Sequence, residues 1–267
     1  MAKSNKFNGC FRLEGKIAVI TAASTGIGYA IAERFLHEGA KVVISSRKQS
    51  HVDEAIQKLI RDGAPKDNVA GIVCHVGEAE HRQRLLDFSL KTFGAVHILV
   101  NNAGINPTFG DIALIGEKEW DKLFEINVKA AHLLTQAFAP VIAKHGGGSV
   151  IFNASYAAYK TSAGIAAYGV TKTALLALTK AYALSLAPHN IRVNCVAPGV
   201  IKTKLSQALW DPNSPVADQA KAELNNYAGR LGAPPEVASL VAFLASQDAS
   251  YITGETVLVT GGVDARL

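Results

Sequence analysis

The chain has 267 residues, of which 49% are hydrophobic, and its formal net charge at pH 7 is +5. This length suits one α/β domain or two small ones, and the apolar fraction is enough for a large core. Lysines and arginines are spread along the chain, whereas nucleic-acid binding needs a clustered basic face. The charge therefore suits a small anionic ligand and does not indicate a nucleic-acid partner.

Cysteine usage and hydropathy narrow the class further. The cysteines are Cys10, Cys74 and Cys195, an odd number with no close pairing. This argues against a disulfide framework and against a zinc cluster, so we expect no metal and a reducing compartment. No apolar stretch reaches the length of about 20 residues that a membrane-spanning helix needs. The segment 1–11 also lacks the apolar run of a signal peptide.

Strands and helices alternate along the sequence after a polar segment, residues 1–12, that we expect to be a loose tail. Short apolar runs predict strands at Ile17–Thr21, Lys41–Ser45, Val69–Cys74, Val96–Val100, Ser149–Asn153, Arg192–Val196 and Thr256–Val259. The segments between them predict helices at Gly28–His37, Val52–Arg61, Glu80–Phe93, within 117–144, and at about 166–187 and 235–246. This alternation predicts a single α/β domain over residues 13–267, a doubly wound parallel sheet with helices on both faces.

A glycine-containing turn follows the first predicted strand. Ser24, Thr25, Gly26, Ile27 and Gly28 lie between that strand and a helix. Glycines there let the backbone approach a pyrophosphate, and the helix N-terminus offers free N–H groups to its phosphates. A lone Gly-x-Gly is often only a tight turn, but the strand and helix around it predict a dinucleotide site.

The end of the second strand indicates which dinucleotide binds. An acidic residue there would bind the ribose 2′-hydroxyl and repel a 2′-phosphate. The chain has Ser46, Arg47 and Lys48 instead, and Arg47 can donate two hydrogen bonds to phosphate oxygens. This favours NADPH, although a solvated basic strand end would look the same. After the third strand come His75 and Val76, which we interpret as neighbours of the adenine.

Tyr168 and Lys172 are four residues apart on the helix predicted at 166–187, so both project from one face. A tyrosine has a pKa near 10 in water, and an adjacent ammonium favours the phenolate. We expect Lys172 to lower the pKa of Tyr168 by about 3 units, or about 4 kcal/mol, and to hold the nicotinamide ribose. Tyr156 and Lys160 share the spacing, but Tyr156 follows a strand directly and a glycine-containing segment interrupts any helix. Tyr168 is therefore the candidate acid.

Two further polar residues complete the candidate catalytic set. Ser155 follows the strand Ser149–Asn153 and can donate a hydrogen bond to a substrate oxygen as negative charge builds there. Asn127 lies within the helical segment 117–144 and is a candidate to anchor a water between Lys172 and solvent. An amide inside a helix that simply bonds to nearby backbone is the alternative interpretation.

Together these residues resemble the short-chain dehydrogenase/reductase family from about Leu13 onward. The similarity adds further cofactor-binding positions, namely Asn102, Ala103, Gly104, Pro198, Gly199, Ile201 and Thr203. The family implies a Rossmann-like fold and hydride transfer between a nicotinamide and a carbonyl carbon. It also implies acid/base catalysis by Tyr168, carbonyl orientation by Ser155, tuning by Lys172, and a proton relay completed by Asn127. Family members are commonly dimers or tetramers, so we expect a homo-oligomer, with a homotetramer as our choice.

The chain departs from the family pattern at two positions. Ala22 stands where the family's usual first glycine lies, and a methyl group there is harmless only if φ is negative. His75 stands where many relatives carry an aspartate beside the adenine. Both residues lie at the predicted cofactor site.

The resemblance implies an NADPH-dependent carbonyl reductase, with alcohol oxidation as the reverse reaction. We expect the segment at about 204–228 to cover the substrate, because Leu205, Leu209 and Trp210 give it an apolar side; core or interface packing would explain them equally well. A small apolar carbonyl substrate, such as a ketone, an α-dicarbonyl or retinal, would fit. The alternatives are a peroxisomal enoyl-thioester reductase, which would reduce C=C, and a non-catalytic NADPH-binding regulator.

The last three residues are Ala265, Arg266 and Leu267. This small-basic-leucine tripeptide resembles the peroxisomal address Ser-Lys-Leu, which an import receptor reads. We therefore expect the peroxisome as the location, with the cytoplasm as the alternative.

Overall fold

The computed structural model describes residues 11–107, 109–161, 163–211, 213–214 and 226–263. Its centre is a seven-stranded sheet in the order β3-β2-β1-β4-β5-β6-β7, and every pair of neighbours is parallel. The strands are β1 (Ile17–Ile20), β2 (Lys41–Ser46), β3 (Val69–Val73), β4 (Ile98–Asn101), β5 (Gly148–Asn153), β6 (Ile191–Pro198) and β7 (Thr256–Val259). The predicted fold class, a doubly wound Rossmann-like sheet, is confirmed.

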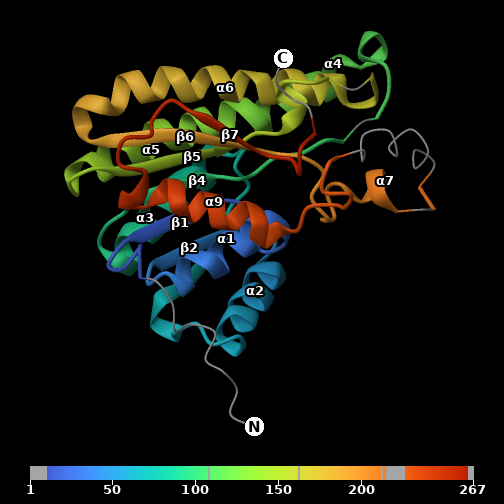
Figure 1. The fold of residues 1–267 in the computed structure, drawn as a ribbon. Helices are drawn as coiled ribbons and strands as arrows, with labels where there is room; N and C mark the ends of the chain where they lie inside the picture. Colours follow the sequence, from blue (N-terminus) through green and yellow to red (C-terminus); the bar gives the residue numbers. More distant parts are fainter. Residues whose placement is uncertain (1–10, 108, 162, 212, 215–225, 264–267) are drawn as a thin grey trace.

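Helices cover both faces of this sheet (Figure 1). The described helices are α1 (Gly26–His37), α2 (Gln49–Arg61), α3 (Ala79–Phe93), α4 (Glu117–Phe124), α5 (Ala130–Lys144), α6 (Ala166–Leu186), α7 (Gln207–Trp210) and α9 (Pro234–Ala245), of which α7 lies to the side of the sheet. One apolar cluster joins α1, α2 and α9 to the sheet, and a second joins α3, α5 and α6 to the other face. Burial on both faces explains why β1 reads as an unbroken apolar run.

The predicted helical segment 117–144 is not one regular helix. Between α4 and α5 the backbone makes a π-helical turn at Glu125–Lys129, which contains Asn127. Such a turn adds a residue to the helical repeat and is frequent at functional sites. The sequence did not indicate it, because one inserted residue hardly changes an apolar pattern of this length.

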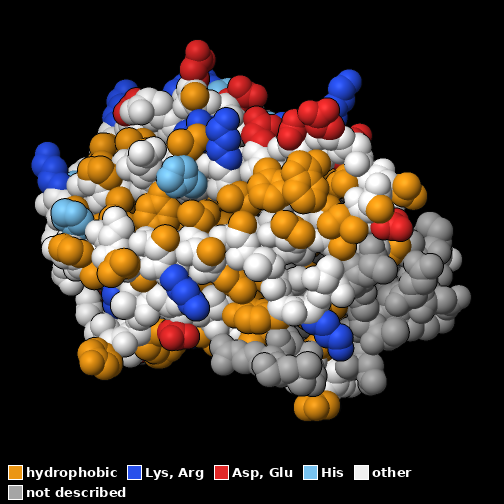
Figure 2. Space-filling view, turned by 90° about the horizontal axis from the view of Figure 1, so that it is seen from above, with side chains coloured by type: hydrophobic (Ala, Val, Ile, Leu, Met, Phe, Trp, Pro, Cys, Tyr) orange, Lys and Arg blue, Asp and Glu red, His pale blue; other side chains and the backbone are white. Residues whose placement is uncertain are grey.

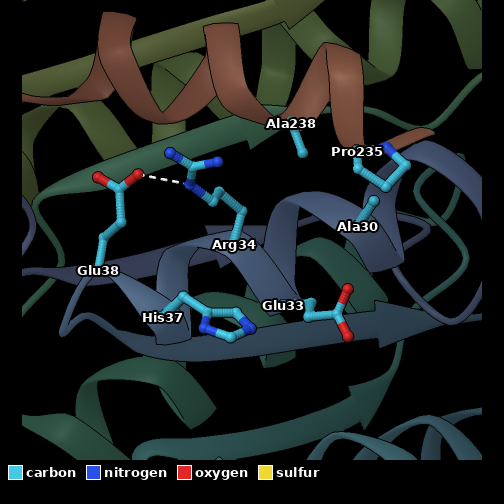
Figure 3. Close-up of a pocket in the computed structure, with 7 residues that line it drawn as sticks. All are labelled: Ala30, Glu33, Arg34, His37, Glu38, Pro235 and Ala238. Atoms are coloured by element: carbon cyan, nitrogen blue, oxygen red, sulfur yellow. Dashed lines mark hydrogen bonds and ion pairs between the residues drawn. The ribbon is translucent and has the colours of Figure 1, made fainter. Parts of the chain in front are cut away.

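An ion pair between Arg34 and Glu38 at the end of α1 lies beside α9, as Figure 3 shows. Glu38 is only 2% exposed and accepts hydrogen bonds from Arg34 at 2.6 Å and from Arg12 at 2.7 Å. Arg34 also donates to Ser239 of α9 at 2.9 Å. The buried carboxylate is therefore paired twice, as a buried charge must be, and Arg34 adds one hydrogen bond to the apolar packing of α9 on α1.

Element ends differ from the sequence prediction by a few residues. β4 begins at Ile98, two residues later than predicted, and α1 begins at Gly26, two residues earlier. Gly26 has a low helix propensity, so the sequence pattern placed the start of α1 too late. The first turn of α1 nevertheless has the free N–H groups that a phosphate would bind. No helix within the described ranges has both the length and the apolar character that crossing a membrane requires.

Candidate active site

A cavity of about 320 Å³ opens at the carboxyl ends of the central strands. The sheet order reverses between β1 and β4, and this switch point is where open parallel sheets bind ligands. The walls of the cavity include Asn102 after β4, Ser155 after β5, and Tyr168 and Lys172 from α6. Side chains far apart in the sequence therefore meet at one edge of the sheet.

Backbone packing explains the glycine at position 28. A Cβ atom there would lie 2.5 Å from the Asn102 side-chain nitrogen and 2.6 Å from the carbonyl oxygen of Ala22. Asn102 in turn donates to the carbonyls of Thr21 and Ala22 at 2.9 and 3.1 Å. The turn after β1 is thus held against the turn after β4. Thr25, the N-cap of α1, makes no side-chain capping bond, so the helix N-terminus is open to a phosphate.

Ala22 does not meet the condition under which its methyl group would be harmless. Its φ is +51°, in the left-handed region, whereas a harmless methyl group required a negative φ. The left-handed conformation costs a non-glycine residue about 1–2 kcal/mol. The turn therefore has the backbone path that glycine allows, and the alanine is strained in it.

Thr21 positions the turn after β4 and was missed in the sequence. Its hydroxyl accepts hydrogen bonds from the backbone N–H groups of Asn102 and Ala103, both at 3.0 Å. It also donates to the Val100 carbonyl at 3.4 Å. The sequence does not show that a threonine at a strand end holds another turn in place, because its partners are backbone groups at the end of another strand.

The end of β2 lies beside the same turn. Ser24 donates a hydrogen bond to Ser46 at 3.1 Å, which joins the turn after β1 to the end of β2. Arg47 and Lys48 follow and are exposed, so both side chains are available to a phosphate on the ribose. Lys48 is also the N-cap residue of α2.

His75 and Val76 lie beyond β3, the strand next to β2. The His75 imidazole accepts a hydrogen bond from the Gly77 N–H at 3.2 Å. Val76 is buried, and its carbonyl accepts from Arg82 at 2.7 Å. Both residues line the turn at this end of the sheet, and their contact with an adenine stays a prediction.

Tyr168, Ser155 and Lys172 form the catalytic candidate. Tyr168 and Lys172 lie one turn apart on α6, and the Lys172 Nζ atom is 5.4 Å from the centroid of the Tyr168 ring. A hydrogen bond links Ser155 to Tyr168. Ser155 is the N-cap of a short 3₁₀ turn at Tyr156–Ala158, and its hydroxyl accepts from the Ala157 N–H at 3.2 Å. The cap fixes where the Ser155 oxygen lies relative to the phenol.

Burial sets the charge states of this group. It raises the pKa of Tyr168 to about 12, and the hydrogen bond from Ser155 offsets part of that rise. Burial also lowers the pKa of Lys172 to about 8. The expected drop in the pKa of Tyr168 is therefore wrong for the protein's own residues, because burial raises that pKa instead. The Lys172 amine donates its hydrogen bond to the Asn153 carbonyl at 2.8 Å.

Asn153 is a second residue that sequence reasoning missed as a site residue. Its main-chain carbonyl holds Lys172, and its side-chain nitrogen donates to the Asn102 oxygen at 2.8 Å. Asn153 is 8% exposed and lines the cavity. Hydrogen bonds thus run from Ala22 through Asn102 and Asn153 to Lys172. A polar residue at the end of the apolar strand 150–152 was the available signal.

Asn127 occupies the π-helical turn and is fully buried. Its side-chain oxygen accepts from the Ile105 N–H at 2.8 Å, and its nitrogen donates to the Ile105 carbonyl and to Thr171, both at 3.0 Å. A Cβ atom on Gly104 would lie 3.1 Å from the Lys172 nitrogen and 3.6 Å from the Asn127 oxygen. Asn127 therefore fastens the segment after β4 to α6 beside Lys172. Its anchoring of a water stays a prediction.

Tyr156 and Lys160, the second pair with the four-residue spacing, do not form a similar site. Tyr156 is only 6% exposed and begins the 3₁₀ turn, whereas Lys160 is exposed. Tyr156 does line the cavity, but Lys160 does not. The four-residue spacing therefore places a lysine beside Tyr168 alone.

The segment after β6 closes the site from the opposite side. Pro198 ends β6, Gly199 and Ile201 line the cavity, and Ile201 bridges to Gly232. Thr203 approaches the phosphate turn, since a Cβ atom on Gly26 would lie 3.4 Å from its methyl group.

Trp210 ties α7 to this segment by donating to the Thr203 carbonyl at 3.3 Å. Leu205 and Leu209 line the cavity, whereas Trp210 lies against Lys202. That this segment covers a substrate stays a prediction. Residues 212 and 215–225 of that segment lie outside the described residues, as does the C-terminal tripeptide. In the described ranges, no three His, Cys, Asp or Glu residues gather closely enough to hold a metal ion.

Comparison with known proteins places this geometry in a family. A family model described as "Enoyl-(Acyl carrier protein) reductase" matches residues 21–264. A protein of Caenorhabditis elegans named dehydrogenase/reductase SDR family member 4 is 56% identical over 97% of this chain and 99% of its own length. The Homo sapiens protein of the same name is 50% identical over 96% of this chain and 90% of its own length.

A solved structure agrees with these sequence matches. It is a 3-ketoacyl-(acyl-carrier-protein) reductase from Brucella melitensis in complex with NADH. It aligns with a TM-score of 0.84 and 31% sequence identity, covering 94% of this chain and 98% of that one. The structural similarity therefore extends over nearly the whole chain.

Proposed function

The chain belongs to the short-chain dehydrogenase/reductase family, and from this we propose that it is an NADPH-dependent carbonyl reductase that also oxidises the product alcohol. The observation that carries the proposal is the hydrogen-bonded pair of Ser155 and Tyr168 on the cavity wall, with Lys172 one turn away. Two hydroxyl groups on one wall suit a substrate whose reacting group ends in an oxygen atom.

The residues present fit a nicotinamide dinucleotide. The N-terminus of α1, where Thr25 makes no side-chain capping bond, leaves backbone N–H groups free for the pyrophosphate. Thr25, Gly26 and Ile27 complete this turn, and Tyr168 and Lys172 would hold the nicotinamide ribose. When bound, the reduced nicotinamide supplies the hydride.

The chain's own part in the reaction is to bind the oxygen and deliver a proton. Ser155 would donate a hydrogen bond to the carbonyl oxygen and so stabilise the negative charge that builds there. Tyr168, whose pKa is raised to about 12, is protonated at neutral pH and would give its proton to that oxygen. Lys172, with its pKa lowered to about 8, carries a charge at neutral pH and would stabilise the phenolate that remains.

The preference for NADPH rests on Arg47 and Lys48, which are exposed beside Ser46 at the end of β2. We expect Arg47→Asp to shift the ratio of kcat/KM values from NADPH towards NADH by at least tenfold, because a carboxylate repels the 2′-phosphate. Arg61→Asp changes the same charge at the far end of α2 and serves as the control. An unchanged ratio in Arg47→Asp would remove Arg47 from phosphate recognition.

One experiment separates the proposal from its rivals. Purified protein is incubated with NADPH or NADH and with ketones, α-dicarbonyls, retinal or enoyl thioesters, and the nicotinamide absorbance is followed. We expect turnover of carbonyl compounds. Turnover of enoyl thioesters alone would establish the enoyl-thioester reductase, a reading that the description of the matching family model also favours. Tight NADPH binding without any turnover would establish the regulator.

We also propose that the protein is a homo-oligomer, a dimer or tetramer, with a homotetramer as our choice. Figure 2 looks down on the side of the molecule where α6 lies in Figure 1, and it shows hydrophobic side chains spread over this face. On α6, Val170 is 39% exposed and Leu184 is 82% exposed. Light scattering at several protein concentrations would measure the assembly, and a monomer at all of them would contradict it.

The proposed location is the peroxisome, through recognition of Ala265, Arg266 and Leu267 by an import receptor. A fluorescent protein fused in front of the chain should enter peroxisomes. The same fusion without the tripeptide should stay in the cytoplasm. Equal distributions of the two fusions would contradict this address.

A further inference from the structure

One residue of the cavity wall carries a buried oxygen atom without a hydrogen-bond partner. Asn153 is 8% exposed and lines the cavity, and no group among the described residues donates to its side-chain oxygen. The Ser45 hydroxyl and the Asn101 oxygen also lack a partner in that part of the chain, but neither residue lines the cavity. Nearly all buried polar groups in proteins are paired, and the cavity is the open space beside Asn153.

The neighbouring hydrogen bonds fix which end of the Asn153 amide is unpaired. The Asn102 nitrogen donates to the carbonyls of Thr21 and Ala22, at 2.9 and 3.1 Å, so it must face them. The oxygen of Asn102 is therefore the end that faces Asn153, and only the Asn153 nitrogen can donate to it, at 2.8 Å. The Asn153 oxygen is consequently left as an acceptor without a donor.

Lys172 supplies the complementary groups beside this acceptor. Its Nζ atom donates to the main-chain carbonyl of Asn153 at 2.8 Å, and both residues line the cavity. An ammonium has three donors, so Lys172 can also donate to a ligand. A hydroxyl group suits both residues, since it can accept from Lys172 and donate to Asn153. A phosphate or carboxylate oxygen only accepts, and would leave Asn153 unpaired.

We propose that the side-chain oxygen of Asn153 accepts a hydrogen bond from a hydroxyl group of the nicotinamide ribose, the sugar that Lys172 would also hold. This rests on the proposed function only in requiring a nicotinamide dinucleotide in the cavity, and it makes no use of the carbonyl substrate. The Asn153 side chain then adds a direct coenzyme contact to its bond with Asn102.

Coenzyme binding to the wild type and to Asn153→Leu, measured by isothermal titration calorimetry, tests this contact. Leucine has a similar size but no acceptor, so the Kd for NADP⁺ should rise about three- to tenfold, the effect of one neutral hydrogen bond. Adenosine 2′,5′-bisphosphate lacks the nicotinamide ribose, and its Kd should change by less than about twofold. Equal losses for both ligands would mean that Asn153 acts only through Asn102 and the phosphate turn, and would overturn the proposal.

Asn101→Leu is the matched control. Asn101 is 3% exposed, its nitrogen donates to Thr135 at 3.0 Å and its oxygen is also unpaired, but it does not line the cavity. The Kd for NADP⁺ should therefore change by less than about twofold. A rise as large as that in Asn153→Leu would attribute the effect to the loss of any buried amide at this end of the sheet, against the proposal.

The 3-acetylpyridine analogue of NADP⁺ identifies the donor on the coenzyme. A methyl ketone replaces the carboxamide and removes its N–H groups, while the ribose is unchanged. Asn153→Leu should therefore weaken binding of the analogue by the same factor as binding of NADP⁺. An effect that disappears with the analogue would assign the donor to the carboxamide and overturn the ribose contact.

The binding data separate this contact from the proposed function. Unchanged NADP⁺ affinity in Asn153→Leu, together with ketone reduction by the wild type, would overturn the contact alone. A wild type that binds no nicotinamide dinucleotide would overturn both. Asn153→Val, which places a β-branched residue in the strand, provides the same comparison if leucine prevents folding.

Discussion

Replacing Lys172 by methionine should change stability and activity in opposite directions at neutral pH. Lys172 is 3% exposed, and burial lowers its pKa from 10.5 to about 8. Below pH 8 both the folded and the unfolded chain carry the charge, and a shift of this size corresponds to a cost of roughly 3 kcal/mol to the folded state. Methionine fills similar space without the charge.

The pH dependence of the unfolding free energy separates this cost of the buried charge from other effects of the substitution. Because the folded-state pKa of the amine lies below the unfolded one, the cost is complete below pH 8 and disappears as the pH rises towards 10.5. At pH 10 about 1 kcal/mol should remain. Loss of the bond to the Asn153 carbonyl costs Lys172→Met about 1–3 kcal/mol, but equally at every pH. The wild type should therefore gain about 2 kcal/mol relative to the variant between pH 7 and pH 10.

Urea denaturation without coenzyme, at pH 7 and pH 10 and at one fixed protein concentration, measures this difference. Lys180→Met, which removes an exposed lysine from the same helix, is the control, because it takes no buried charge from the protein. Ketone reduction by Lys172→Met should be lost. A stability difference between the wild type and Lys172→Met that stays constant from pH 7 to pH 10 would refute the reasoning.

Two other substitutions test the groups around this lysine. Ser155→Ala should lower kcat/KM for ketones by about 100- to 1000-fold, because a hydrogen-bond donor to the charged oxygen is lost. The Kd for NADPH, measured by fluorescence titration, should not change. A loss of coenzyme affinity with unchanged ketone reduction would contradict the role of Ser155. Ala22→Gly should stabilise the protein by up to about 1 kcal/mol in urea denaturation, because glycine relieves the strain at φ +51°. Ala79→Gly, at the first residue of α3, should not stabilise it, and equal effects in both variants would argue against strain at Ala22.

The fold could be predicted from the sequence because its periodic pattern is strong. Buried parallel strands such as β1 read as short apolar runs, and the helices between them are long enough to be recognised. The π-helical turn at Glu125–Lys129 could not be predicted in this way, since it changes the repeat by one residue without changing which residues are apolar. Strand ends also shifted by a residue or two, because pairing with neighbours decides where a strand stops.

The sequence predicted the site residues that act through their side chains better than those that act through backbone groups. The spacing of Tyr168 and Lys172 places both on one face of α6, and this depends only on helical geometry. The carbonyl of Asn153 that holds Lys172 has no sequence signal, because every residue has a carbonyl. The direction of the Tyr168 pKa shift also depended on burial, which the sequence does not give.

The most direct test of the central claim compares Tyr168→Phe with Tyr156→Phe, the tyrosine with the same spacing to a lysine. Steady-state ketone reduction with NADPH is measured for both variants and the wild type. Tyr168→Phe should lose reduction almost completely while binding NADPH nearly as well as the wild type, and Tyr156→Phe should keep most of its activity. A Tyr168→Phe variant that reduces ketones at a rate comparable to the wild type would contradict proton delivery by Tyr168.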